Sequence, residues 1–241
     1  VWCMEQAVCE NQPLPDTSVN QRRGNAMKHL GTQLGYLLVL GVAISTPVGA
    51  AQTQDVQAQD VQVATQLTQE ITTSRALKDS MFRQGEASPL LAEDRANFGG
   101  LKYFPIDLRF RLTGRLHRYA RIRQVRIPDT NGTQMSVERI GRFHFQYDGK
   151  PFWLEVMGST RDDDLSVYFT DETNGITTYP AGRYAPILRT EDGTYLLDFN
   201  SAYSPYCAYN PAYTCPLPPP QNRLDFRVQA GETLTGPDLA H

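Results

Sequence analysis

The stretch FHFQYDGKPFWLEV, residues 143–156, predicts two adjacent β-strands joined by a tight turn. Apolar side chains stand at every second position on both sides of its centre, which is the period of a strand with one buried face. The central pair Asp148-Gly149 accepts the positive φ angles of a two-residue hairpin turn. We therefore expect a β-hairpin, with His144 on the face opposite the aromatic side chains.

The same turn signal recurs along the chain. Asn-Gly or Asp-Gly pairs also begin at Asn131, Asn174 and Asp192, between segments with strand character. Further alternating segments lie at 106–112, 165–169, 195–200 and 224–228. Together these signals predict a mainly β domain over 99–232, an antiparallel meander closed into a small barrel or sandwich of about seven to nine strands.

The segment before this domain predicts one N-terminal helix. Apolar residues between Leu67 and Phe82 fall near helical spacing, and Gly85 is a typical stop. We expect a helical lead-in over 67–98. Residues 52–66 are rich in Gln and poor in apolar side chains, so a flexible linker is expected there.

The preceding residues have the features of a secretory signal. A short basic start at Met27 leads into an apolar run over 34–44, which is followed by small residues. The run is too short for a membrane span, which needs about 20 residues. We expect a signal peptide over 27–51, cleaved after Ala50 or Ala51, and a periplasmic or secreted protein with no transmembrane span after cleavage. The alternative is an uncleaved anchor.

The two ends of the chain lie outside this scheme. Residues 1–26 show no periodicity, and Arg22-Arg23-Gly24 could be encoded by a purine-rich ribosome-binding sequence just before a start at Met27. We therefore expect an upstream translation artefact, with a genuine N-terminal extension as the alternative. Residues 233–241 form a short tail.

Positive charge is concentrated in one part of the chain. The whole sequence has a net charge of −3, which is not a nucleic-acid-binding signature. Between Lys102 and Arg126, however, seven arginines and one lysine stand against the single acid Asp107. Because arginine grips phosphate and carboxylate with two bonds, this run is a candidate contact for a small molecule or an anionic envelope component. The expected contact residues are Arg109, Arg111, Arg121 and Arg123. The alternative, favoured by the acidic overall charge, is a solvated sheet face balanced by acids on neighbouring strands.

No familiar catalytic or metal-binding motif accompanies this charge. Asp162-Asp163-Asp164 lacks the alternate spacing and distal glutamate of a calcium loop. The chain has no G-x-S-x-G, phosphate-cradling glycine loop or H-E-x-x-H. A nucleophilic pair of Cys207 and His144 would need a free thiol, which export disfavours. We therefore predict no metal site, and the cofactor is unknown.

Residues 202–224, AYSPYCAYNPAYTCPLPPPQNRL, form neither a helix nor a central strand, because six prolines fall between Tyr203 and Pro220. Cys207 and Cys215 are the cysteines that remain after signal cleavage, and an even pair in an exported protein favours a disulfide. We expect a stapled aromatic loop that forms a lid or plug over one end of the barrel.

Three segments carry a family resemblance: FGGLKYFPIDLRFRL, FTDETNGITTYPAGRY and LLDFNSAYSPYCAYNPAYTCPLPPPQNRLDFRVQAGE. They resemble the bacterial and archaeal DUF1684 family, a domain of unknown function. Ser204 and Gln221 depart from the family pattern, which often has Asn and Glu at these positions. The resemblance implies no activity, substrate or cofactor. Several residues on its signature are candidate ligand contacts: Arg183, Tyr184, Asp198, Asn200, Tyr209, Asn222 and Glu232.

These observations favour a non-catalytic domain that binds a ligand or associates with the envelope. Tyrosine and proline offer rigid contact area at low entropic cost, as binding surfaces require. The alternative is an enzyme of unknown reaction that uses a polar cluster of Arg183, Asp198, Asn200 and Glu232. Convergence of these four side chains in a concave pocket would favour the enzyme.

Overall fold

The computed structural model describes residues 48–158 and 164–234. The expectations for residues 1–47, for Asp162-Asp163 and for the end of the tail lie outside the described residues. The helices are α1 (Val48–Gln84) and α2 (Ala92–Arg95). The strands are β1 (Arg111–Pro128), β2 (Gln134–Tyr147), β3 (Lys150–Gly158), β4 (Leu165–Phe169), β5 (Arg183–Arg189) and β6 (Tyr195–Asp198). Short 3₁₀ turns are η1 (Leu108–Phe110), η2 (Phe199–Ser201), η3 (Tyr206–Ala208) and η4 (Pro220–Asn222).

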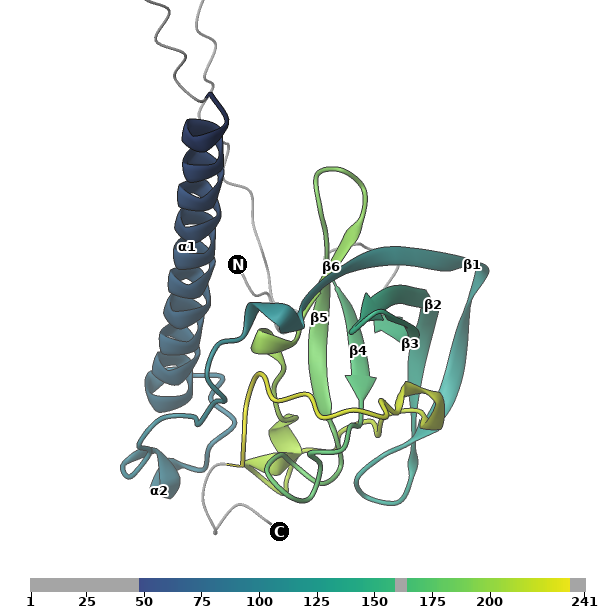
Figure 1. Ribbon diagram of the computed structural model, residues 1–241. Helices are drawn as coiled ribbons and strands as arrows, with labels where there is room; N and C mark the ends of the chain where they lie inside the picture. Colours follow the sequence, from purple (N-terminus) through teal and green to yellow (C-terminus); the bar gives the residue numbers. More distant parts are fainter. Residues whose placement is uncertain (1–47, 159–163, 235–241) are drawn as a thin grey trace, which may run out of the picture. The chain divides into compact units, whose positions relative to one another are not determined.

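The strands form a closed antiparallel barrel in which each strand pairs with the next and β6 pairs with β1 (Figure 1). The mainly β class and the barrel are confirmed, but the described residues contain six strands rather than seven to nine. The expected last strand over 224–228 has no ladder partner. Its chain joins the segment after β4 at Thr170, through the bridge to Arg223 and the bond from the Leu224 N–H, and at Glu172, whose N–H donates to the Phe226 carbonyl at 3.4 Å.

All four turn signals lie in connections between neighbouring strands. In the β2–β3 hairpin, Asp148 and Gly149 have φ angles of 49° and 71°, as a two-residue turn requires. The pairs at Asn131 and Asp192 lie in the β1–β2 and β5–β6 connections. The pair at Asn174 lies in the longer β4–β5 connection, where the Asn174 side chain donates to the Tyr179 carbonyl at 2.7 Å.

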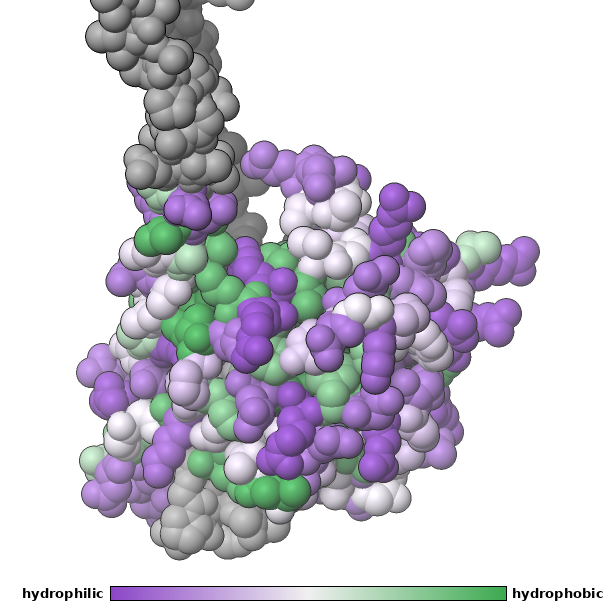
Figure 2. Space-filling view, viewed as in Figure 1, coloured by the Kyte–Doolittle hydropathy of each residue, from purple (hydrophilic) through white to green (hydrophobic). Residues whose placement is uncertain are grey.

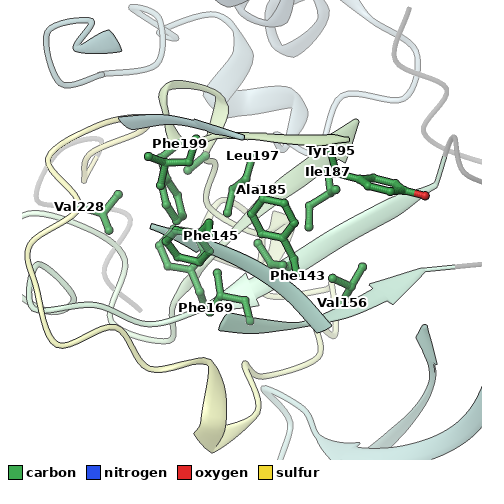
Figure 3. Close-up of a cluster of buried hydrophobic side chains, with 14 of the residues drawn as sticks. Phe143, Phe145, Val156, Phe169, Ala185, Ile187, Tyr195, Leu197, Phe199 and Val228 are labelled. Carbon is green, nitrogen blue, oxygen red and sulfur yellow. The ribbon is translucent and has the colours of Figure 1, made fainter. Parts of the chain in front are cut away.

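Inward side chains of all the strands fill the barrel with a single apolar cluster (Figure 3). Phe143, Phe145, Leu154 and Val156 are all buried, as the alternation around the first hairpin predicts. Val228 also belongs to this cluster, although it is not on a strand. The chain after β6 therefore contributes to the core without extending the sheet.

Helix α1 is longer than expected and includes residues 52–66, so the prediction of a flexible linker there is wrong. Gln and Ala are good helix formers, and a helix anchored at one end extends through such residues without burying them. Ile71 and Phe82 are buried, whereas residues 57–63 are exposed. No helix in the described part of the chain combines the length and apolar character needed to cross a membrane.

Candidate functional site

Arg183, at the start of β5, is fully buried and holds the C-terminal segment. Its guanidinium donates to Asp171 Oδ2 at 2.8 Å and to the carbonyls of Val228, Ala230 and Glu232 at 2.8, 2.6 and 3.2 Å. Burial lowers the pKa of Arg183, and the Asp171 carboxylate opposes this shift. The side chain thereby satisfies three carbonyls of a segment that belongs to no ladder of the barrel.

Asn222 plays a similar part between β3 and β4. These strands pair only at Met157 and Gly158, so the backbone around Glu155 has no β4 partner. Asn222 Oδ1 accepts from the Glu155 N–H at 2.7 Å, and its Nδ2 donates to the carbonyls of Glu155 and Tyr168 at 2.9 and 2.8 Å. One fully buried amide thereby links both strands.

Asn200 and Asp198 form a third internal contact. Asn200 Oδ1 accepts from the Asp107 N–H at 2.9 Å, and its Nδ2 donates to the Asp107 carbonyl at 2.9 Å. Asp198 accepts from the Asn200 amides and pairs with Arg111 at 2.7 Å. These polar atoms fix the entry to β1 and the exit from β6.

Glu232 connects the barrel to helix α1. Its carboxylate accepts from Lys78 Nζ at 2.5 Å, the Ser204 N–H at 2.8 Å and the Tyr209 hydroxyl at 2.5 Å. Burial and the Glu232 charge raise the pKa of Tyr209, so its hydroxyl stays protonated and donates. No sequence signal pointed to Lys78, because it is one of several polar residues on the helix.

The Tyr/Pro loop, residues 203–220, packs against the outer side of β5 and the β1–β2 turn. Tyr184 donates its hydroxyl to the Pro216 carbonyl at 2.6 Å, and the Leu217 N–H donates to the Pro128 carbonyl at 2.8 Å. A Cβ on Gly182, whose φ is 105°, would lie 2.5 Å from a Pro218 ring atom. The loop thus braces the β1–β2 turn and the start of β5.

Cys207 and Cys215 lie next to each other in this loop as free thiols. The Cys207 N–H donates to Cys215 Sγ at 3.3 Å, and the Tyr179 hydroxyl lies 3.9 Å from Cys207 Sγ. The side-chain hydrogen bond from Cys215 lowers the pKa of Cys207 to about 7. The same bond and burial raise the pKa of Cys215.

The seven candidate contacts therefore serve as internal connections. Arg183 meets Glu232 through its backbone, whereas Asp198 and Asn200 form a separate group with Asp107 and Arg111. Their hydrogen bonds go mainly to backbone and to one another. None of the four residues proposed for an enzyme lines the open depression on β1, β2 and β3.

The four candidate arginines divide into two pairs. Arg109 pairs with Asp107 at 2.6 Å, and Arg111 pairs with Asp198 at 2.7 Å. Arg121 and Arg123 are exposed on the distal half of β1. Of these four arginines, only Arg121 and Arg123 are exposed without an ion pair to another described residue.

An open depression of about 600 Å³ lies on the outer face of β1, β2 and β3. Its lining residues include basic, polar and apolar side chains but no acid. They are Arg111, Leu112, Thr113, Gly114, Arg115, His117, His144, Phe145, Gln146, Pro151 and Phe152. The imidazoles of His117 and His144 lie 4.7 Å apart between ring centroids. Sequence alternation placed His144 on the outer face, but only the strand register brings His117 beside it.

Fold and site together define a closed antiparallel barrel whose polar signature residues hold its connections, with a basic depression on its outer face. The family described as "protein of unknown function (DUF1684)" matches residues 96–233. The chain therefore belongs to this family, as the resemblance of its three segments implied.

One solved structure supports the same relationship. It is the solution NMR structure of an uncharacterised protein of Haloarcula marismortui, which is 30% identical in sequence with a TM-score of 0.54. The similarity covers 75% of this chain and 96% of the archaeal one. The comparison with curated proteins gives no match.

Proposed function

We propose that this protein is an exported, non-catalytic domain that docks on an anionic phospholipid membrane of the cell envelope. The observation that carries the proposal is the charge of β1 and β2. From Arg111 to Arg142 there are eight arginines against two acids, Asp129 and Glu138, in a chain whose net charge is −3. Figure 2 shows hydrophilic side chains projecting from the side of the domain where β1 and β2 lie.

The contact surface is a basic ribbon, which we define as Arg115, Arg121, Arg123 and Arg126, all exposed on β1, with Arg123 and Arg126 on opposite faces of the strand. Beyond Arg123 only β1 and β2 pair with each other, so this part projects from the barrel wall as two strands. An arginine near an anionic membrane contributes about 1 kcal/mol. Four such residues would supply about 4 kcal/mol, equivalent to a dissociation constant of about 1 mM.

Export and the disulfide belong to the same proposal. The basic and apolar features of residues 27–51 support a signal peptide. The Tyr/Pro loop contacts the turn that ends the basic ribbon, through Leu217 and Cys215. A disulfide between Cys207 and Cys215 in an oxidising compartment would make this brace more rigid.

Co-sedimentation with phosphatidylglycerol vesicles tests the docking. We expect binding at low salt, weakening in 0.5 M NaCl because exposed charges are screened. Replacing two ribbon arginines, in R121Q/R123Q, should lower partitioning about 30-fold. The matched control R223Q/R227Q removes the same charge from exposed positions outside the ribbon and should lower it far less. Equal losses in both variants, or no binding at low salt, would refute the proposal.

A further inference from the structure

The register of β1 and β2 places arginines opposite histidines on the outer face of the barrel, so that protonation of the histidines creates like charges on neighbouring strands. Arg115 pairs with His144, and His117 pairs with Arg142. All four side chains are exposed, and the two imidazoles contact each other edge to face. We call these residues the cationic quartet. Like charges directly opposite on neighbouring strands destabilise a sheet unless something neutralises them.

Among residues 48–158 and 164–234, the groups around the quartet do not supply that neutralisation. Arg142 lies 4.4 Å from the centroid of the Trp153 ring on β3 and donates to the Tyr119 hydroxyl on β1 at 3.1 Å. Glu155 on β3 is opposite Arg142 in register, but its carboxylate binds Arg139 at 2.6 Å. Arg111, at the other end of the depression, is likewise paired with Asp198.

The depression beside the quartet has the composition of a site for an anion attached to a larger group. Arg115, His117 and His144 line it together with the neutral Gln146 and the apolar Phe152. Guanidinium and protonated imidazole groups are hydrogen-bond donors only, so they suit a ligand rich in acceptor oxygens. Phosphate esters have this chemistry, and arginine binds them in a bidentate manner.

We propose that the cationic quartet binds the phosphate group of a phosphate ester, and that binding takes up protons on His117 and His144. The inference deepens the proposed function, on which it rests for the source of the phosphate: a phospholipid headgroup in the membrane. A soluble phosphate ester would present the same group to the quartet.

The direction of the pH dependence follows from the surroundings of the imidazoles. Burial, His117 and Arg142 all lower the pKa of His144 in the unbound protein. A phosphate bound by the quartet favours the charged imidazoles and so opposes the lowering of the His144 pKa. The affinity for the phosphate group therefore increases as the pH falls through the usual histidine range near 6.5. Each proton taken up on binding increases it by up to about tenfold per pH unit.

The test measures binding of dimethyl phosphate to the full-length protein at pH 5.5 and pH 8 by NMR titration. Dimethyl phosphate remains a monoanion over this range, so any change in affinity belongs to the protein. We expect at least tenfold tighter binding at pH 5.5 and an upward shift of both histidine titration curves when the ligand is present. Equal affinity at the two pH values, or no binding at pH 5.5, would overturn the inference.

Variants separate the quartet from the ribbon. H117N/H144N should bind dimethyl phosphate with no pH dependence, whereas R126Q, a ribbon change outside the quartet, should behave like the wild type. Both change exposed side chains, and thermal unfolding checks that the fold is retained. An unchanged pH dependence in H117N/H144N would refute the inference.

Phosphatidylglycerol vesicles distinguish the two proposals. Vesicle binding without dimethyl phosphate binding would leave the membrane proposal standing and refute the quartet. Proton-linked phosphate binding without vesicle binding would refute the membrane as the source and support a soluble ester.

Discussion

Replacing Asn222 by alanine tests the conclusion that signature residues substitute for missing strand pairing. The change removes three hydrogen bonds, to the Glu155 N–H and to the carbonyls of Glu155 and Tyr168. Each bond contributes about 1 kcal/mol net, and a buried group left without a partner costs about 1–3 kcal/mol. With some relaxation around the vacated space, we expect N222A to lower the free energy of unfolding by about 3–5 kcal/mol.

Urea unfolding followed by fluorescence is the assay, because Trp153 lies on β3 beside the affected backbone. N222D should be at least as destabilising at pH 7, since a carboxylate of the same size cannot donate to two carbonyls. The control N210A removes a partly exposed side chain with bonds to Pro89 and Ala212 and should cost about 1 kcal/mol. A loss below 1 kcal/mol for N222A would refute the reasoning.

Two further predictions concern the helix and the thiols. K78M leaves the buried Glu232 carboxylate without its cation and should lower the free energy of unfolding in urea by about 3 kcal/mol. The control L77A, at a position 66% exposed, should change that free energy by less than about 0.5 kcal/mol. Equal effects of the two variants would contradict the role of this ion pair. In reduced protein, alkylation of Cys207 by iodoacetamide should increase as the pH rises through about 7, because the thiolate is the nucleophile and its pKa is lowered. Cys215 should react much more slowly, and the reverse order would contradict the assignment. Protein purified from the oxidising compartment should contain no free thiol at either position.

Local patterns predicted the barrel wall well. In the hairpin around Asp148, the alternation of apolar residues and the Asp-Gly turn pair both depend on local backbone geometry. They therefore predicted correctly that Phe143 and Leu154 are buried. The segment 224–228 misled the strand count, because its alternation reflects burial against the barrel rather than membership of a ladder. The linker prediction failed for a related reason: low hydrophobicity at 52–66 shows that little is buried there, not that the chain is non-helical.

The candidate site was harder to predict, because it depends on contacts between distant positions. The signature drew attention to Arg183 and Asn222, but their partners are largely backbone atoms, which have no sequence signal. The side-by-side placement of His117 and His144 depends on the β1–β2 register. An irregularity between Arg118 and Arg123 alters that register along β1, and the composition of the strand does not reveal it.

Hydrogen–deuterium exchange with phosphatidylglycerol nanodiscs tests the central claim most directly. If the protein docks through the basic ribbon and the cationic quartet, amides of β1 and β2 between Arg115 and Arg142 should gain protection at low salt. Residues 198–232, which hold the structure internally, should then change little. Protection confined to residues 198–232, with β1 and β2 unaffected, would contradict the account.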